Sequence, residues 1–315
     1  MKILLTTDWF TPAVNGVVIS VLNLRRGLES RGHQVRVLTL SRSPSSYVQD
    51  GVYYLRSMGM GAVYPKARLG VPLQKKLLKE LLAWGPDIVH SNCEFSTFPA
   101  ACYIAEKANV PLLHTYHTIY ENYTHYFSPS RTWGKKVVRQ FSRWAACRTD
   151  GIIAPTEKAA SLLRRYKVPC PLYVVPTGIA KPQAAGQSES HILRKTLGIA
   201  DNQTVLLYLG RLAAEKNCAE LLRTMVRFQD APVTLLLVGD GPDRRALERL
   251  SRQLNLDRHI LFAGMVPPEQ VGRYYQLGDL FVSASTSETQ GLTYMEALRA
   301  GLPLLCRRDA CLDGV

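Results

Sequence analysis

Two short segments place cations, carboxylates and glycines where a predicted strand ends and a helix begins. The first reads GRLAAEKN over Gly210–Asn217 and follows the apolar run Val205–Leu209. Arg211 and Lys216 therefore lie at the carboxyl end of a predicted parallel strand, the edge at which open α/β sheets bind ligands. Two cations there suit a diphosphate, because Arg and Lys form charge-assisted hydrogen bonds with phosphate oxygens. Taken alone, the segment could also be a solvated turn with two surface cations.

The second segment reads SETQGLTYME over Ser287–Glu296 and also follows a predicted strand. Gly291 and Leu292 would present backbone N–H groups at a helix start, which is a site for a phosphate. Glu288 precedes this helix, and Glu296 lies about one turn further along it. Two carboxylates beside an anion site make chemical sense as hydrogen-bond acceptors for the hydroxyl groups of a sugar and a ribose. For Glu296 alone, a position on the helix surface is the plain alternative.

A third candidate is Gly16, between the first predicted strand and the first predicted helix. A glycine there lets the backbone approach a ligand closely, and a helix N-terminus favours anions. Loops at this position often contain glycine, so Gly16 adds to the case for an anion site only together with the two segments above.

Short β-rich runs alternate with helical patterns along the chain, which predicts parallel βαβ units and a doubly wound α/β sheet in each half. The polar stretch 180–190 separates the halves. We therefore expect a Rossmann-like domain over 1–178, a linker over 179–190 and a second Rossmann-like domain over 191–315. Strands are predicted at Lys2–Thr7, Gln34–Leu40, Asp87–His90, Pro111–His114, Gly151–Ala154, Leu172–Val175, Val205–Leu209, Val233–Val238, Ile260–Phe262, Leu280–Val282 and Pro303–Cys306. Helices are predicted at Val17–Arg31, Leu73–Trp84, Thr97–Ala108, Trp133–Arg148, Glu157–Tyr166, Asn217–Phe228, Asp243–Leu254, Pro268–Gln276 and Leu292–Ala300.

Composition excludes several classes of protein. Hydrophobic residues make up 46% and charged residues 20% of the 315 residues, which is typical of globular and not of disordered chains. No apolar run approaches the ~20 residues that span a bilayer, and the start MKILLTTD does not have the pattern of a signal peptide. The seven cysteines include no CxxC pair, so we expect a reducing cytoplasm, no disulfide framework and no metal site.

The basic charge is unevenly distributed. Residues 1–180 carry 23 Lys and Arg against 10 Asp and Glu, whereas residues 181–315 carry 16 against 15. A one-sided excess suggests that the first domain faces an anionic surface, either a membrane or a nucleic acid. No pattern of a known nucleic-acid-binding module is present, which disfavours the second. A dinucleotide-dependent oxidoreductase is disfavoured too, because the first strand–helix turn lacks GxGxxG and the segment Gly239–Asp243 is not that motif.

Two predicted helices of the first domain, Leu73–Trp84 and Trp133–Arg148, are basic on one side and apolar on the other when placed on a helical wheel. No acidic residue occurs between Arg131 and Thr149. Basic amphipathic helices with tryptophan can lie in an anionic membrane interface. The alternative is that the apolar stripes pack on the sheet and the basic faces are merely solvated. The residues expected to face a membrane are Lys75, Lys76, Lys79, Trp133, Lys135, Lys136, Arg139 and Arg143.

Together these segments resemble the retaining glycosyltransferases of family 4, over residues 1–315 and with the motifs in the family's order. Within that family, the chain is most similar to bacterial 1,2-diacylglycerol 3-α-glucosyltransferases. The motifs that carry the family resemblance are Asn15–Val17, Tyr116–Glu121, Pro176–Ile179, Gly210–Asn217 and Glu288–Glu296, and those that carry the narrower likeness are Thr6–Pro12 and Glu288–Thr293.

The resemblance implies a GT-B fold, with two facing Rossmann-like domains, and a role for each candidate residue. Arg211 and Lys216 would hold the nucleotide diphosphate, Gly16 would lie close to the same phosphates, and His117 would lie near C6 and the anomeric carbon of the sugar. A loop histidine with a purely structural role is the alternative for His117. The implied catalytic residues are His117, Glu288, Arg211 and Lys216, and the implied donor-binding residues are Gly16, Arg211, Lys216, Met265, Val266, Glu288, Gly291, Leu292 and Glu296, with Glu288 at the sugar, Glu296 at the ribose and the backbone of 265–266 at the nucleobase.

The implied reaction is transfer of a hexose, glucose from UDP-glucose as the specific expectation, to a lipid hydroxyl group with retention of configuration. Diacylglycerol is the expected acceptor, at the cytoplasmic face of the membrane to which the protein binds peripherally. No cofactor or metal is expected, since the sequence has no Asp-x-Asp motif. Transfer of mannose to a phosphatidylinositol-type lipid and transfer to a soluble acceptor are the alternatives.

The second domain is expected to be incomplete. The chain stops at Val315, shortly after a predicted strand, whereas family members continue further and return a final helix to the first domain. The activity of the 315-residue form is therefore an open question at this stage. A non-catalytic, membrane-associated remnant is the alternative from another class of function.

Overall fold

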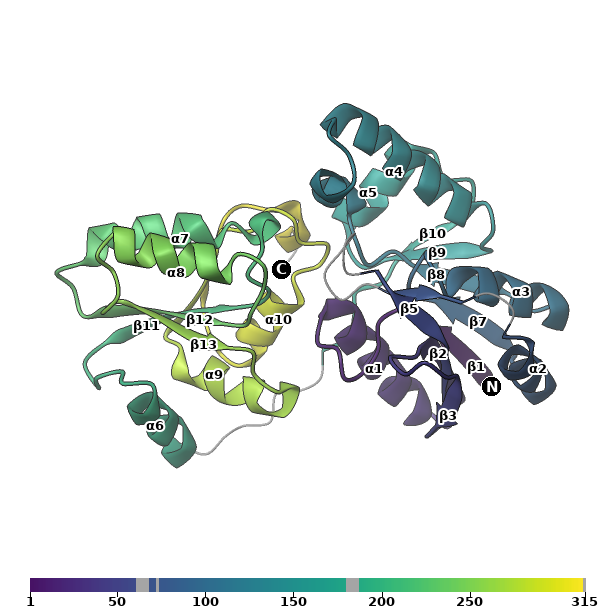
Figure 1. Ribbon diagram of the computed structural model, residues 1–315, viewed down its shortest axis with the longest axis horizontal. Coiled ribbons are helices and arrows are strands. Elements are labelled where there is room, and N and C mark those ends of the chain that lie inside the picture. The colour runs from purple at the N-terminus through teal and green to yellow at the C-terminus, as the bar shows by residue number, and fades with distance from the viewer. Residues whose placement is uncertain (61–67, 72–73, 180–186, 314–315) are drawn as a thin grey trace. The chain divides into compact units, whose positions relative to one another are not determined.

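Parallel strand pairing organises both halves of the chain. The computed structural model describes residues 1–60, 68–71, 74–179 and 187–313, and the chain divides into an N-terminal unit, Met1–Gly178, and a C-terminal unit, Ile179–Val315 (Figure 1). Of the linker expected over 179–190, residues 180–186 lie outside the described residues. Residues 187–190 form the first turn of a helix, α6 (Gln187–Thr196), instead of a linker.

The N-terminal unit contains, among its described residues, an eight-stranded sheet in the order β10-β9-β8-β7-β1-β2-β4-β3. All neighbours pair in parallel except β3 with β4 at one edge. The central strand carries Leu4 and Leu5, both fully buried, because helices cover both faces of a parallel sheet. The strands are β1 (Lys2–Thr6), β2 (Gln34–Leu40), β3 (Tyr47–Gln49), β4 (Val52–Leu55), β7 (Ile88–Ser91), β8 (Leu112–Thr115), β9 (Gly151–Ala154) and β10 (Leu172–Val174), with a separate antiparallel pair of β5 (Ser57–Gly59) and β6 (Arg68–Gly70).

The helices of this unit lie on both sides of the sheet (Figure 1). α2 and α3 pack in one core cluster with Leu4 and Leu38, whereas α1 packs in another with Leu5 and Val37. Asn15 caps α1, since its side chain accepts a hydrogen bond from the backbone N–H of Val18 at 3.0 Å; such caps contribute about 1 kcal/mol. The helices are α1 (Gly16–Glu29), α2 (Lys75–Trp84), α3 (Phe98–Ala108), α4 (Arg131–Ala146) and α5 (Glu157–Tyr166), with the 3-10 helix η1 (Tyr120–Tyr126) before α4.

The C-terminal unit has a parallel sheet of five strands in its described part, in the order β13-β12-β11-β14-β15. α7 and α8 cover one face, and α9 and α10 cover the other (Figure 1). The strands are β11 (Thr204–Leu209), β12 (Val233–Val238), β13 (Ile260–Gly264), β14 (Leu280–Ser283) and β15 (Leu304–Cys306). The helices are α7 (Cys218–Met225), α8 (Arg244–Gln253), α9 (Val271–Leu277) and α10 (Leu292–Arg299), with short 3-10 turns η2 (Ala214–Lys216), η3 (Val226–Phe228), η4 (Pro268–Gln270) and η5 (Ala310–Leu312).

Each sheet has a point at which the strand order reverses. In the N-terminal unit the chain moves outward from β1 through β2 and then returns to β7 on the other side of β1. In the C-terminal unit the same reversal lies between β11 and β14. Ligands of open α/β sheets bind outside the carboxyl ends of the strands at such a switch point.

Every predicted strand and helix has a counterpart, and the α/β class is confirmed. The predicted helix at 73–84 is seen from Lys75, and Leu73 lies outside the described residues. The sequence analysis missed the β3–β4 hairpin. Its turn is formed by Asp50 and Gly51, both with positive φ (50° and 74°), and an Asp-Gly pair between β-prone residues is a strong hairpin signal.

Candidate functional site

The two candidate anion-binding segments meet at the switch point of the C-terminal unit. The first follows β11 and the second follows β14, which are neighbours in the sheet. The Lys216 ammonium donates to the Glu288 carboxylate at 2.5 Å, and both side chains are less than one-fifth exposed. Ser287 Oγ donates to the backbone carbonyl of Glu215 at 2.9 Å. The structure therefore joins residues that lie 72 positions apart in the sequence into one site.

Arg211 lies in the same loop and carries a half-buried charge. Burial lowers the pKa of its guanidinium, and the nearby carboxylates of Glu215 and Asp243 partly oppose that shift. A guanidinium that has lost part of its hydration interacts more strongly with an anion than one in bulk water. The alternative of a solvated turn does not describe this loop, because neither Arg211 nor Lys216 is a freely exposed cation.

Two glycines allow the Arg211 loop to lie against the loop that follows β12. A Cβ atom on Gly239 would lie 2.0 Å from the Gly210 carbonyl oxygen, and one on Gly241 would lie 2.1 Å from that of Leu212. The backbone N–H of Leu212 donates to the carbonyl of Asp240 at 3.1 Å. The sequence analysis considered this Gly-Asp-Gly segment only as a dinucleotide motif. Its role in the structure is to position the backbone beside Arg211.

The second carboxylate, Glu296, is partly buried in α10 and not a helix-surface residue. Its Oε2 accepts a hydrogen bond from the Tyr275 hydroxyl group at 2.8 Å. Burial raises the pKa of Glu296, and the bond from Tyr275 acts in the opposite direction. Gly291 has a φ of 73°, at which a side chain would be strained, and a Cβ there would lie 2.6 Å from the Tyr294 ring. Leu292 is the first residue of the helix that Gly291 precedes. Tyr275 was missed because no motif contains it.

The expected nucleobase segment lies directly after β13. Met265 is 55% exposed, whereas the Val266 side chain is buried in the core. The Val266 side chain is therefore not available to a ligand, and the expected contact through the backbone of 265–266 stays a prediction. In the N-terminal unit, Gly16 is the exposed first residue of α1.

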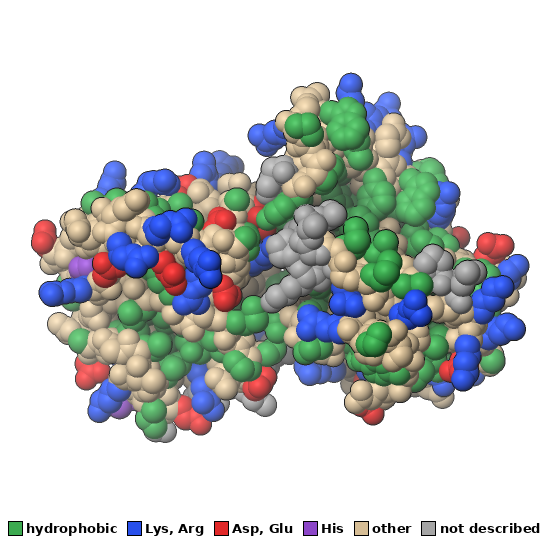
Figure 2. Space-filling view, in the orientation of Figure 1, with side chains coloured by type: hydrophobic (Ala, Val, Ile, Leu, Met, Phe, Trp, Pro, Cys, Tyr) green, Lys and Arg blue, Asp and Glu red, His purple; other side chains and the backbone are tan. Residues whose placement is uncertain are grey.

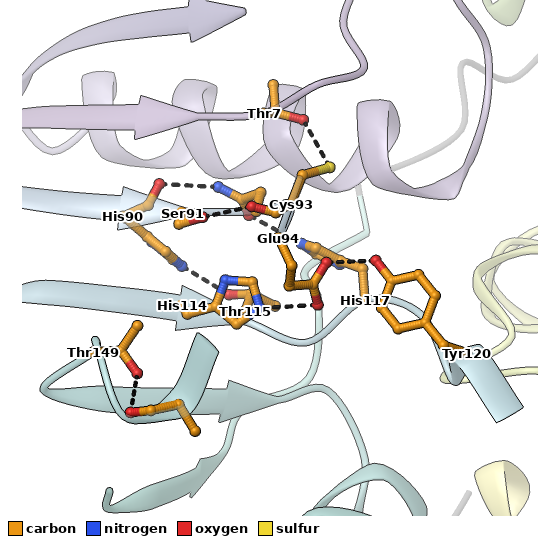
Figure 3. Close-up of polar contacts among 12 residues, drawn as sticks. Thr7, His90, Ser91, Cys93, Glu94, His114, Thr115, His117, Tyr120 and Thr149 are labelled. Carbon is orange, nitrogen blue, oxygen red and sulfur yellow. Dashed lines mark hydrogen bonds and ion pairs between the residues drawn. The ribbon is translucent and has the colours of Figure 1, made fainter. Parts of the chain in front are cut away.

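His117 belongs to a polar cluster at the carboxyl ends of β7 and β8 (Figure 3). Its Nε2 lies 2.9 Å from Asn92 Oδ1. The buried carboxylate of Glu94 accepts from the Tyr120 hydroxyl group and lies 3.1 Å from His114 Nε2. This cluster lies beside β1, at the switch point of the N-terminal sheet.

Of this cluster, only His117 was predicted as a site residue, and Asp8 and Tyr120 lie within the motifs Thr6–Pro12 and Tyr116–Glu121 without a predicted role. The buried carboxylate of Asp8, for example, accepts three hydrogen bonds from Ser96 and Thr97 at 2.7–2.8 Å, and burial raises its pKa. The signal that could have found these residues is that polar side chains directly follow three adjacent strands. The residues without a predicted role are Asp8, His90, Asn92, Glu94, His114 and Tyr120.

His117 and His90 are held neutral. Burial lowers the pKa of His117 from 6.5 to about 3, and the nearby His114 and His90 add to the shift. Burial likewise lowers the pKa of His90 to about 4, with a further contribution from His114.

The two basic helices of the N-terminal unit differ in what they bury. α2 packs Leu77 and Leu81 into the core and leaves its three lysines exposed. α4 buries the face that carries the smaller residues Gly134, Val138 and Ser142, and not its most hydrophobic face. Its apolar stripe faces solvent, and the alternative that this stripe packs on the sheet is wrong for α4. The exposed fractions are 56% for Trp133, 36% for Val137 and 38% for Trp144.

The basic residues of α4 do not form one free face. Lys135 pairs with Glu121 at 3.0 Å, and Arg143 donates to the backbone carbonyl of Tyr166 at 3.2 Å. Lys136 lines a groove together with residues of the apolar stripe. The expectation that the basic residues and the stripe lie on opposite sides of the helix is therefore wrong for Lys136. The groove is lined by Lys136, Val137, Gln140, Phe141 and Trp144, and Figure 2 shows green and blue side chains together over the region of α4.

Comparison with known proteins decides the family. Residues 14–181 match the family model described as Glycosyltransferase Family 4, and residues 189–312 match that described as Glycosyl transferases group 1. The chain belongs to family 4 of the glycosyltransferases. It is 34% identical over 322 residues to an alpha-monoglucosyldiacylglycerol synthase of Streptococcus pneumoniae, with 100% of this chain and 73% of the relative covered. It is 33% identical to a synthase of the same name from Acholeplasma laidlawii, with 99% and 82% covered.

Solved structures confirm the GT-B fold expected of this family-4 glycosyltransferase. A structure of HepE from Anabaena in complex with UDP and glucose superposes with a TM-score of 0.76 at 19% identity, covering 100% of this chain and 83% of that one. Sucrose-phosphate synthase from Thermosynechococcus elongatus gives 0.72 at 20% identity, covering 97% and 80%. At these identities the likeness shows the fold alone.

Replacing Arg211 or Lys216 with Ala should each lower the turnover of sugar transfer by 10²–10³-fold, about 2.7–4 kcal/mol of transition-state stabilisation. The reason is that negative charge grows on a diphosphate as the sugar leaves. Steady-state turnover and the urea midpoint should be measured together, because Lys216→Ala also leaves Glu288 without its ion-pair partner. Arg223→Ala, which removes an exposed cation of α7, is the control and should stay within threefold. Turnover within threefold in both site variants would remove the diphosphate assignment.

The free energy of unfolding should decrease as the pH falls below 6.5. Unfolded His117 takes up a proton near pH 6.5, whereas folded His117 takes one up only near 3, so the unfolded state binds more protons between those values. One such histidine contributes a slope of about 1.4 kcal/mol per pH unit in that window. Urea midpoints from pH 7.5 to 4.5 should therefore fall less steeply for His117→Asn than for the wild type. His191→Gln, at an exposed position, should keep the wild-type slope. Identical slopes in all three proteins would contradict the assigned shift.

Proposed function

We propose that this glycosyltransferase moves glucose from UDP-glucose to the free hydroxyl group of diacylglycerol, with retention of anomeric configuration. The observation that carries the proposal is the relationship, at 33–34% identity over almost the whole chain, to two proteins named alpha-monoglucosyldiacylglycerol synthase. The site residues are compatible with a nucleotide-sugar donor, because cations and carboxylates meet at one switch point.

The proposed reaction breaks the bond between the anomeric carbon and the phosphate oxygen and forms one to the acceptor oxygen on the same face of the sugar. The proton of the acceptor hydroxyl group passes to the departing phosphate. Arg211 and Lys216 stabilise the charge on that phosphate. Glu288 accepts hydrogen bonds from the sugar, and Glu296, held by Tyr275, accepts from the ribose. Because the two cations supply positive charge at the diphosphate, we propose that transfer needs no metal ion.

We further propose that the protein binds peripherally to the inner face of the cell membrane through its N-terminal unit. In the described part of the chain, no helix combines the length and apolarity that crossing a bilayer requires. Lys75, Lys76 and Lys79 are exposed on α2, and α4 exposes Lys136 and Arg139 beside its aromatic stripe. Such a combination of basic and aromatic side chains suits an anionic interface.

The donor and acceptor should be tested together with purified protein. We expect a glucolipid from UDP-glucose and diacylglycerol in anionic vesicles, unchanged by EDTA, with the α configuration when the anomeric signals of the product are read by NMR. GDP-mannose with phosphatidylinositol is the second arm, because a GDP-mannose-dependent alpha-mannosyltransferase of Mycolicibacterium smegmatis is 26% identical over 97% of this chain. A product only in that arm, only with a soluble sugar acceptor, or in no arm would each contradict the proposal.

Membrane binding should depend on five exposed cations. Changing Lys75, Lys76, Lys79, Lys136 and Arg139 to Gln should weaken binding to anionic vesicles roughly tenfold or more, since each cation near such a surface contributes up to about 1 kcal/mol. Lys135 and Arg143 are left intact because they contact Glu121 and Tyr166. The measurement is vesicle sedimentation at 0.1 and 1 M salt, where the Debye length falls from ~10 to ~3 Å.

The control carries the same change in charge on the C-terminal unit. It replaces five exposed arginines with Gln, and it should bind vesicles as the wild type does. A separate double variant, Trp133→Ser with Trp144→Ser, should lose the vesicle binding that remains at 1 M salt. Equal loss in the control and the test variant would show that only net charge matters and would remove the N-terminal unit as the membrane-binding surface. The control positions are Arg223, Arg227, Arg245, Arg249 and Arg252.

A further inference from the structure

The connection between β7 and α3 contacts β8 and the segment after it through two side chains (Figure 3). Glu94 contacts His114 and Tyr120, which lie on either side of His117 in the sequence. Asn92, only 2% exposed, contacts His117 itself. The contacts of Glu94 hold the segment in place, and the contact of Asn92 orients the imidazole ring of His117.

The orientation of the Asn92 amide is determined by a second hydrogen bond. Its Nδ2 donates to the backbone carbonyl of His90 at 3.2 Å, so its Oδ1 points toward His117 Nε2 at 2.9 Å. An amide oxygen can only accept a hydrogen bond, and therefore Nε2 of His117 must carry a proton.

A neutral imidazole has one N–H group, so its other nitrogen is an acceptor. His117 stays neutral because burial, together with His114 and His90, lowers its pKa to about 3. Of the carboxylates nearby, Glu94 contacts His114 and Tyr120, and Asp8 accepts hydrogen bonds from Ser96 and Thr97.

We propose that Asn92 is a positioning residue that places the proton of His117 on Nε2, so that Nδ1 accepts a hydrogen bond from a hydroxyl group of the transferred sugar. The proposal rests on the proposed function for the identity of that ligand. An Nδ1 acceptor selects a hydroxyl donor, whereas an Nδ1–H or an imidazolium would attract phosphate or carboxylate oxygens instead. Asn92 thus contributes to the choice of ligand without touching it.

Two substitutions and one control test the role of Asn92. Asn92→Leu has similar volume and no acceptor, Asn92→Asp keeps the acceptor oxygen and adds a charge, and Thr115→Val removes the partner of another buried histidine, His90, at 2.7 Å. The first readout is the ¹⁵N spectrum of the histidine rings in the ligand-free protein, with the His117 signals assigned by their loss in His117→Asn. The second is kcat/KM against pH, and urea midpoints report stability.

We expect the wild-type spectrum to show His117 protonated on Nε2 alone. Asn92→Leu should give a mixture of the two neutral forms and lower kcat/KM by roughly threefold to tenfold, the equivalent of one neutral hydrogen bond. Asn92→Asp should restore kcat/KM at pH 8 and lose it as the pH falls, because the carboxylate favours the imidazolium. Thr115→Val should lower the urea midpoint without changing the His117 signals or the pH profile.

The role of Asn92 is overturned if wild-type His117 carries its proton on Nδ1. It is equally overturned if Asn92→Leu leaves the spectrum and kcat/KM unchanged, or if Asn92→Asp has the wild-type pH profile. Because the spectrum is recorded without substrate, it is independent of the proposed function. A protein that transfers no sugar from any donor would overturn the proposed function, and with it the sugar hydroxyl group as the ligand of Nδ1, whatever the spectrum shows.

Discussion

The reversal of strand order in each sheet is the constraint on which both candidate sites depend. Parallel strands end at one edge, and where neighbouring strands continue in opposite directions the loops that follow them separate and leave room for a ligand. In the C-terminal unit this happens between β11 and β14, which brings Lys216 to Glu288. In the N-terminal unit it happens between β1 and β7, and the loops there carry Gly16, Asp8 and Asn92.

Charged and polar groups at these edges are partly buried, and each is stabilised by a specific partner. Burial of an unpaired charge costs several kcal/mol, so an ion pair or hydrogen bonds must offset it. Lys216 and Glu288 offset each other, Glu296 has Tyr275, and Asp8 has the backbone and hydroxyl group at Thr97. A ligand anion at Arg211 and Lys216 would have to compete with Glu288 for the ammonium group, which would make donor binding and the proposed sugar contact of Glu288 interdependent.

The sequence predicts elements and motifs better than it predicts contacts. Alternating apolar runs predicted the strands of both sheets except β3 and β4, and position after a strand identified Arg211, Lys216 and Glu288 as candidate site residues. Tyr275 could not be found this way, because it is defined by its partner Glu296 on another helix. Asn92 directly follows β7, but its contact with His117, 25 positions away, is not evident from that position. Gly241 was missed for a related reason, since its function is the absence of a Cβ atom 2.1 Å from a backbone oxygen of another loop.

The helix α4 shows why hydrophobicity alone does not identify the buried face of a helix. A Cβ atom on Gly134 would lie 2.9 Å from the Thr124 side chain, so η1 approaches the small face of α4 more closely than a larger residue permits. Close packing over that face is favourable, and the aromatic stripe lies on the outer side of the helix. There the Phe141 ring stacks on that of Trp144, with ring centroids 5.8 Å apart, and on that of Phe95, with ring centroids 5.2 Å apart. Apolar surface of this kind is costly in water and commonly marks a contact with a membrane or a partner. Because the stripe adjoins exposed cations, it supports the proposed contact with an anionic lipid surface, which would bury the rings and neutralise the charge at once.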